Sequence, residues 1–195
     1  MFANIVLLLI LLLFFVVGFS WVIASRIMKK PRQLISYDWD AQGVTYERIS
    51  FYSSDGLKLV GVFLHGTNGQ TVILLHGYGR SKEQMIPHAL FLNRAGYNIL
   101  IFDFRASGQS EGTVITFGGK EQSDLEGAVL YLKNRKDVNT DKIGVLGFSM
   151  GGAVALMKSG DLPEIRAIVI NSTYARFKTV IWNNFQQYFR GLPFF

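Results

Sequence analysis

The chain contains no cysteine and only three histidines among its 195 residues. The missing thiols exclude disulfide bonds, thiolate catalysis and cysteine-ligated zinc or iron–sulfur sites. His65, His76 and His88 show neither HExxH spacing nor an accompanying cluster of carboxylates. We therefore expect no metal site and assign no cofactor.

Acidic residues are missing from the first 32 positions, which hold four basic residues, Arg26, Lys29, Lys30 and Arg32. The whole chain carries a formal net charge of +6, from 20 basic and 14 acidic residues. Without those four, 16 basic residues face the 14 acidic ones from residue 33 onward, a difference of only +2. The positive charge thus flanks the N-terminal segment instead of forming a binding face, and we expect no nucleic-acid partner.

Charge of either sign is absent from residues 5–24, IVLLLILLLFFVVGFSWVIA. Twenty helical residues at about 1.5 Å each span about 30 Å, the thickness of the hydrocarbon core of a bilayer. Trp21 near one end and the basic cluster beyond it are typical of a membrane–water boundary. We therefore expect residues 1–30 to form one uncleaved transmembrane anchor that binds the lipid bilayer through residues 5–24.

Two other interpretations of this segment explain less. A cleaved secretory signal has basic residues before a shorter apolar core, and here no lysine or arginine precedes the run. A buried core helix would need some polar side chains facing water, and the segment offers none. Because all the flanking lysines and arginines follow the span, the positive-inside rule predicts a single-pass membrane protein with its folded domain in the cytoplasm.

The chain beyond the anchor predicts an α/β fold. Residues 31–44 have little periodicity and indicate a linker. The strand-like runs 46–52 and 57–65 are joined by SSDG, whose Asp-Gly pair favours a tight antiparallel hairpin. Later runs alternate with helical patterns, which is typical of parallel strands with flanking helices. We assign residues 45–195 to this domain, with strands at 71–77, 97–104, 143–149 and 165–173, helices at 85–95, 120–135 and after Ser149, and a stretch at 174–195 that resembles the start of a helical lid.

Ser149 occupies the joint between a strand pattern and a helix pattern in IGVLGFSMGGAVAL. A tight strand-to-helix turn exposes a serine hydroxyl above the sheet, and the bracketing Gly147 and Gly151 avoid clashes at the turn. The free N–H groups at the start of the new helix point toward the site, so Met150 N–H is expected to donate to an oxyanion. Gly-x-Ser-x-Gly also arises by chance in a chain with 20 glycines, but its strand and helix context favours a nucleophile.

A second motif, His-Gly-Tyr-Gly, ends the strand pattern at 71–77. The N–H of Tyr78 is placed to serve as the other oxyanion donor, and Gly77 and Gly79 let the backbone approach a substrate closely. His76 has two interpretations, a catalytic base or a side chain that braces the loop through a hydrogen bond. Its position at the end of the strand favours bracing.

The ordered motifs HGYG, DFRASGQS (103–110) and GFSMG resemble those of the α/β-hydrolase superfamily. Within it the chain is similar to the membrane-anchored branch related to serine aminopeptidases, esterases and acyl-protein thioesterases, from about residue 45 onward. The resemblance implies structural roles for Asp103 and Arg105, bracing the loop beside the nucleophile. Ala106 stands where that branch commonly has glycine. Asp103 could instead be the triad acid, but it precedes the serine, and in this superfamily the acid follows it.

The resemblance also exposes a gap after the serine. Only two acids, Asp161 and Glu164, and no histidine follow Ser149, whereas the family order is serine, acid, histidine. Both acids are expected in a helix-to-strand connection, at the wrong edge of the sheet for catalysis. We therefore expect the N-terminal portion of a longer hydrolase, C-terminally incomplete, inactive alone and prone to aggregate through uncovered sheet surface.

The function expected from these residues is acyl transfer to water through an acyl-Ser149 intermediate. Small-molecule esters, thioesters of acylated proteins and N-terminal peptides are all candidate substrates. A non-catalytic, membrane-tethered scaffold with a hydrolase fold is the alternative. The missing histidine favours the scaffold, and the intact serine turn and oxyanion loop favour the enzyme.

Overall fold

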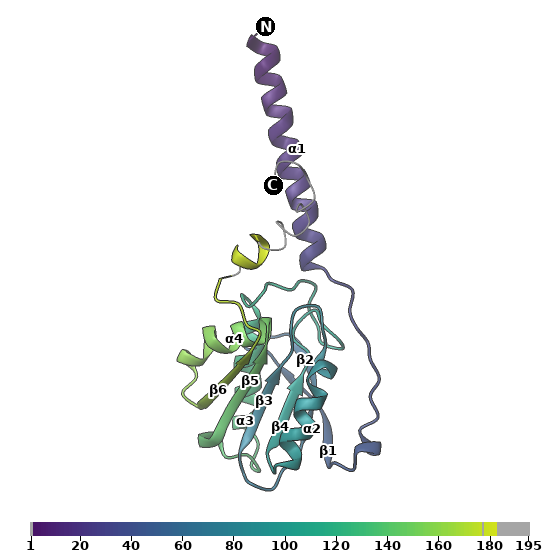
Figure 1. The fold of residues 1–195 in the computed structure, drawn as a ribbon, viewed down its shortest axis with the longest axis vertical. Coiled ribbons are helices and arrows are strands. Elements are labelled where there is room, and N and C mark those ends of the chain that lie inside the picture. Colours follow the sequence, from purple (N-terminus) through teal and green to yellow (C-terminus); the bar gives the residue numbers. More distant parts are fainter. Residues whose placement is uncertain (1, 177, 183–195) are drawn as a thin grey trace.

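The computed structural model describes residues 2–176 and 178–182, and Figure 1 shows a sheet with helices on both faces and one long helix leaving the domain. The sheet has six strands in the order β1-β2-β4-β3-β5-β6. The strands are β1 (Tyr46–Tyr52), β2 (Lys58–Leu64), β3 (Thr71–Leu75), β4 (Asn98–Phe102), β5 (Ile143–Phe148) and β6 (Ile165–Asn171). The helices are α1 (Phe2–Met28), α2 (Ile86–Arg94), α3 (Glu121–Lys133) and α4 (Met150–Lys158), with 3₁₀ turns at Asp40–Gln42, Lys82–Met85, Thr140–Lys142 and Ser159–Asp161.

Strand directions confirm the predicted fold. β1 pairs antiparallel with β2, and β2 pairs antiparallel with β4. β4, β3, β5 and β6 are mutually parallel. The hairpin turn between β1 and β2 is closed by Ser53, whose N–H donates to Leu57 O at 2.8 Å, and Gly56 adopts φ 94° there. This left-handed conformation explains why the turn contains glycine.

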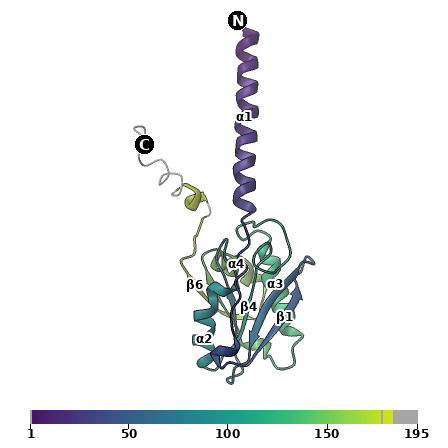
Figure 2. The same ribbon diagram turned by 90° about the vertical axis from the view of Figure 1, so that its right-hand side faces the viewer.

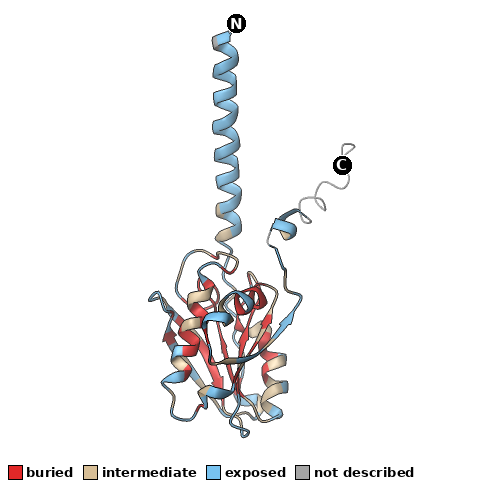
Figure 3. Cartoon of the chain, turned by 90° about the vertical axis from the view of Figure 1, so that its left-hand side faces the viewer, coloured by how far each residue is buried: buried red, intermediate tan, exposed pale blue. Residues whose placement is uncertain are grey.

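Side chains on the two faces of the sheet enter two separate cores. In β2, Phe63 packs with α3 and α4 on one face, whereas its neighbours Val62 and Leu64 pack with α2 on the other. The central strand β3 divides in the same way, with Ile73 and Leu75 on the α3 and α4 side. Burial on both faces is why these strands read as continuous apolar runs rather than alternating ones. The buried centre of the sheet is visible in Figure 3.

Helix α1 projects from the domain and is exposed except near its end, where Ser25 and Met28 are partly covered (Figures 2 and 3). The stretch Asn4–Met28 is long and apolar enough to cross a membrane, and its most apolar 18-residue window has a mean hydropathy of 3.0 with none of it buried. A core helix would be mostly buried, so that interpretation of residues 5–24 is wrong. A signal sequence near the N-terminus passes the same test of length and apolar composition.

The edge strand β6 carries exposed apolar side chains. Val169 and Ile170 keep 57% and 46% of their surface accessible. β6 has β5 on one side, and no other strand of the described chain pairs with its outer edge. Within the described part of the chain, this edge therefore presents exposed apolar side chains, and aggregation through it stays a prediction. The helical lid predicted at 174–195 falls largely on residues 177 and 183–195, which lie outside the described part of the chain.

Candidate active site

Ser149 lies at the junction of β5 and α4, as its sequence context predicted. Its backbone has φ 51° and ψ −110°, a conformation that residues with a Cβ rarely adopt. Its N–H donates to Asn171 O of β6 at 2.8 Å, and its carbonyl accepts from Ala153 N–H of α4 at 3.2 Å. The neighbouring strand and the following helix thus hold the serine in a strained turn, a feature that clusters at functional sites.

Gly147 and Gly151 allow the strand and helix to approach each other. A Cβ on Gly147 would lie 2.5 Å from the carbonyl carbon and oxygen of Gly151. A Cβ on Gly151 would lie 2.4 Å from Leu75 O and 2.8 Å from His76 O. Both distances are too short for any side chain. The glycines therefore bring α4 against the end of β3, which places the serine turn beside the loop after β3.

The loop His76–Gly79 lies directly beside Ser149. A Cβ on Gly77 would be 3.5 Å from Ser149 Cβ, and Gly77 N–H donates to Gln84 Oε1 at 2.8 Å. Gly79 turns the loop with φ 64°. Tyr78, between them, is half-buried, and burial raises the pKa of its phenol. Met150 is the first residue of α4, so helix geometry gives its N–H no acceptor within the helix.

His76 is fully buried and engaged through both ring nitrogens. Its Nδ1 lies 2.8 Å from Gly77 O, and its Nε2 lies 3.0 Å from Phe104 N, which is a donor. Nε2 therefore accepts a hydrogen bond and Nδ1 carries the proton. Burial lowers the pKa of the ring, which favours this neutral form. Such an arrangement braces the loops after β3 and β4 against each other and leaves no ring nitrogen to take a proton from Ser149.

Asp103, at the end of β4, holds two loops together from a fully buried position. Its carboxylate accepts from Lys82 N–H and Lys82 Nζ, both at 2.8 Å, and from Gln109 N–H at 3.0 Å. A Cβ on Gly108 would lie 2.2 Å from this carboxylate. Ala106, which replaces a glycine of the family pattern, adopts φ 57° and is buried.

Arg105 joins the same loop to the hairpin turn and to α3. Its Nε and Nη2 donate to Asp124 Oδ1 at 2.9 and 2.7 Å, and Nη1 and Nη2 donate to Asp55 at 2.8 and 2.7 Å. Arg105 and Asp124 are almost completely buried. The guanidinium beside Asp55 lowers the pKa of that carboxyl from 3.8 to about 2.

The Asp55–Arg105 pair predicts an acid-sensitive contribution to stability. Because the pKa of Asp55 is lower in the folded chain, the pair stabilises fully above about pH 4 and loses its contribution as the pH falls through about 2. We expect the midpoint of thermal unfolding to fall less steeply between those pH values in Asp55→Asn than in the wild type. The control Asp141→Asn, an exposed acid 3.8 Å from Arg166, should keep the wild-type slope. Equal slopes for all three proteins would contradict this role of Asp55.

Asp161 and Glu164 lie at the opposite end of the sheet from Ser149. Asp161 ends the turn after α4, where Lys158 donates to it at 3.3 Å. Glu164 immediately precedes β6 and pairs with Lys133 of α3 at 2.5 Å. Since β5 and β6 are parallel, the start of β6 and the end of β5 lie at opposite ends of the strands. Neither acid is therefore close to Ser149.

A group of three potential metal ligands also lies at that far end. One ligand atom from each of Glu47, His65 and Asp137 falls within 4.8 Å of the others. Arg135 donates to both carboxylates, at 2.8 Å to Glu47 and 2.6 Å to Asp137, and lies 4.0 Å over the Phe63 ring. The guanidinium already supplies the positive charge that an ion would bring, so we interpret this group as an ion-pair network.

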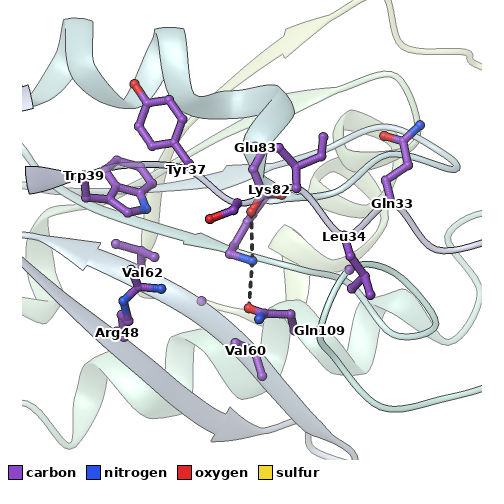
Figure 4. Close-up of a pocket in the computed structure, with 14 residues that line it drawn as sticks. Gln33, Leu34, Tyr37, Trp39, Arg48, Val60, Val62, Lys82, Glu83 and Gln109 are labelled. Atoms are coloured by element: carbon purple, nitrogen blue, oxygen red, sulfur yellow. Dashed lines mark hydrogen bonds and ion pairs between the residues drawn. The ribbon is translucent and has the colours of Figure 1, made fainter. Parts of the chain in front are cut away.

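A cavity of about 460 Å³ lies between the linker and β2 (Figure 4). Trp39 and Val62 contribute apolar walls, and Lys82 reaches in, 3.1 Å from Glu83 and 3.4 Å from Gln109. Ser149 does not line this cavity. Because Trp39 and Val62 pack in the core on the α2 side of the sheet, the cavity lies on that side, apart from the serine turn.

Comparisons with known proteins agree with this geometry. The family model described as the α/β hydrolase fold matches residues 70–194. The chain belongs to the α/β-hydrolase fold family. The serine turn, the loop after β3 and the loop after β4 all fall within the matched residues.

Individual relatives point to hydrolases of two kinds. The esterase Pf2001 of Pyrococcus furiosus superposes with a TM-score of 0.78 at 34% identity, covering 86% of this chain and 63% of the esterase. The thiohydrolase aneE of Aspergillus aculeatus is 34% identical over 134 residues, 67% of this chain and 42% of the relative. The uncharacterized protein YfhR of Escherichia coli O157:H7 is 29% identical over 175 residues, 82% of this chain and 61% of the relative. The chain thus spans about three fifths of the length of Pf2001 and YfhR.

Proposed function

We propose that this chain carries the nucleophile and the oxyanion donors of a membrane-anchored serine hydrolase. The observation that supports this most is the strained Ser149 turn between β5 and α4, directly beside the loop of Gly77. A strained serine of this kind is the nucleophile elbow of α/β-hydrolases. The esterase and thiohydrolase relatives support an ester or thioester substrate.

In this proposal Ser149 Oγ bonds to the acyl carbon of the substrate. The N–H groups of Tyr78 and Met150 donate to the oxygen as it becomes negative, which is the usual means of lowering the barrier to acyl transfer. The leaving alcohol or thiol departs, and water then cleaves the acyl-Ser149 bond. His76, Gly77, Gly79, Asp103 and Arg105 position the loops around this centre, and Gly147 and Gly151 allow the serine turn.

Helix α1 is the proposed membrane anchor. Its length and apolar composition support a single span, and Arg26, Lys29 and Lys30 all follow the apolar run. The positive-inside rule then favours a cytoplasmic hydrolase domain.

The 195 residues alone are expected to lack appreciable esterase activity. They contain no histidine after His88, and His76 is already bonded through both ring nitrogens. Without a base the Ser149 hydroxyl stays protonated and is a weak nucleophile. Release of p-nitrophenolate from a short-chain ester by the purified chain should not exceed that of Ser149→Ala. Robust turnover that depends on Ser149 would contradict this expectation.

A fluorophosphonate probe tests the proposed function on the longest natural form of the chain. Covalent labelling at Ser149, abolished by Ser149→Ala, supports the serine hydrolase. Absence of labelling in a folded protein would overturn it. The second candidate, a non-catalytic scaffold, is favoured by the engagement of His76 through both ring nitrogens, and it predicts an unlabelled protein.

A further inference from the structure

The end of helix α1 is bonded to the loops that surround Ser149. Tyr78 Oη donates to Ile27 O at 2.6 Å, and Ile115 N–H donates to Met28 O at 2.8 Å. The Lys30 ammonium lies 4.8 Å from the centre of the Tyr78 ring. Tyr78 follows Gly77 in the loop beside Ser149. Its side chain therefore connects this loop directly to the last turn of α1.

Arg32 fastens the chain after α1 to the loop after β4. Its guanidinium donates to Gly112 O at 2.6 Å, to Gly108 O at 3.3 Å and to Ser110 O. Three main-chain carbonyls of one loop thus accept hydrogen bonds from the Arg32 guanidinium. The planar arrangement of its N–H donors suits several hydrogen bonds at once. Together with Tyr78 and Ile115, this contact ties α1 to the end of the sheet where β3, β4 and β5 terminate. Figures 1 and 2 show α1 leaving the domain from this end.

The position of these contacts along α1 sets their depth relative to a bilayer. Ile27 lies three residues beyond the apolar run 5–24, about 4.5 Å along the axis at about 1.5 Å per residue. Each headgroup layer is about 5–7 Å thick, the difference between about 40–45 Å of membrane and about 30 Å of hydrocarbon, shared by two sides. Tyr78 would therefore lie in the headgroup layer, and its stacking on Phe117 at 4.5 Å presents an aromatic pair at a depth that aromatic residues favour.

We infer that the site beside Ser149 opens into the headgroup layer and that its substrate is an acyl ester of an anionic lipid held in the same membrane. This assignment rests on the proposed serine hydrolase and on the anchoring of α1. To that proposal the inference adds two details: the substrate approaches from the membrane, and its chemical class is a lipid ester.

Depth and charge favour a lipid over a water-soluble ester. The ester carbonyls of membrane lipids lie at the boundary between hydrocarbon and headgroups, next to the level deduced for Tyr78. The exposed Arg26, Lys29 and Lys30 attract anionic headgroups to this region. A soluble ester would have to enter between the domain and the membrane surface to which it is tied.

The reaction balances without a cofactor. Ser149 Oγ bonds to the ester carbonyl carbon, the bond from that carbon to the alcohol oxygen breaks, and the serine proton ends on the leaving lipid alcohol. Water then cleaves the acyl-serine, which returns the serine hydroxyl and releases a fatty acid into the bilayer.

The depth is tested with fluorescent labels on single introduced cysteines, which are unique because the chain has none of its own. Thr113→Cys labels the exposed loop next to the α1 contacts, and Asn68→Cys labels an exposed turn at the opposite end of the sheet. In phosphatidylglycerol-containing vesicles with spin-labelled headgroups, we expect quenching at position 113 and none at 68. Adding Arg32→Ala or Tyr78→Phe should reduce the quenching at 113, whereas Arg94→Ala, which removes an exposed arginine at the end of α2, should not. Equal quenching at 113 and 68 would overturn the inferred orientation.

The substrate class is tested on the longest natural form of the chain in the same vesicles. We expect release of fatty acid from phosphatidylglycerol, and a loss of this release in Ser149→Ala. Cleavage of p-nitrophenyl acetate or of an S-palmitoylated peptide without cleavage of the vesicle lipid would overturn the lipid assignment and keep the serine hydrolase. Absence of all turnover and of fluorophosphonate labelling would overturn the proposed function and the lipid assignment with it. The orientation of the domain is decided separately, by the difference in quenching between positions 113 and 68.

Discussion

Ser149→Ala is expected to reduce kcat/KM for ester hydrolysis by about 10⁴-fold or more in the longest natural form of the chain. Oxyanion donors and substrate binding would leave only residual catalysis without the proposed nucleophile. The expected midpoint of thermal unfolding is unchanged, because Ser149 bonds to Asn171 and Ala153 through its backbone. Initial rates with a p-nitrophenyl ester and a thermal unfolding curve check the two expectations.

Ser172 provides a matched control for this substitution. It also adopts a positive φ, 54° against 51° for Ser149, and it follows the neighbouring strand β6. Ser172→Ala therefore removes a hydroxyl from a residue with a similar φ at the same end of the sheet. It should retain the wild-type rate. Equal losses in both variants would show that the effect is not specific to the hydroxyl of Ser149 and would contradict its role as nucleophile.

Gly147→Ala and Gly151→Ala are each expected to destabilise the fold by about 3 kcal/mol or more. The added methyl group would lie within 2.5 Å of backbone atoms that have no alternative rotamer, Gly151 C and O in one case and Leu75 O in the other. The helix α4 must then move away from β5 and β3, which also moves Ser149. Urea unfolding followed by fluorescence, with the buried Trp39 as a reporter, measures the free energy of unfolding.

Gly144→Ala in the same strand is the control for this pair. Its new Cβ would come no closer than 3.7 Å to another atom, Ala167 O, which is an ordinary contact. The expected change is within about 1 kcal/mol, since alanine also lowers the entropy of the unfolded chain. If all three variants lost the same free energy, the close approach of α4 to β5 would not be the reason for the glycines.

The centre of the sheet was predictable because the strands β3 and β4 are buried on both faces. Leu74 and Ile73 point to opposite cores, so a parallel strand shows a continuous apolar run that sequence alone reveals. β3 and β4 end two residues before the predicted runs do, at Leu75 and Phe102. Beyond these ends the two chains leave the sheet, and Phe104 N–H donates to His76 Nε2, a contact between distant residues that the apolar runs do not reveal.

The serine turn was also predictable, since its signal is contained in five consecutive residues. The partners that hold the surrounding loops were not. Asp124 belongs to the amphipathic helix α3, and an acid in such a helix is normally predicted to face solvent. In the structure it is buried against Arg105. Gln84 accepts from Gly77 N–H across a turn and has no motif of its own. Contacts between residues distant in sequence leave no periodic pattern to detect.

The linker at 31–44 shows a second limit of sequence patterns. Its lack of periodicity predicts an irregular segment, but nothing in its composition predicts that Arg32 binds the loop after β4. The acceptors are main-chain carbonyls, including those of Gly108 and Gly112. Every residue carries such a carbonyl, so the identity of the acceptor residues gives no signal.

Because no strand of the described residues pairs with the outer edge of β6, we expect the solubility of this chain to depend on its concentration. When two copies meet edge to edge, their main-chain N–H and C=O groups pair and Val169 and Ile170 become covered. Such an encounter is bimolecular, so dilution suppresses it, whereas dilution has no effect on unfolding of a single copy. Anchoring by α1 would confine the copies to a plane and align their edges, so crowding in a membrane would promote the same pairing at lower total amounts of protein.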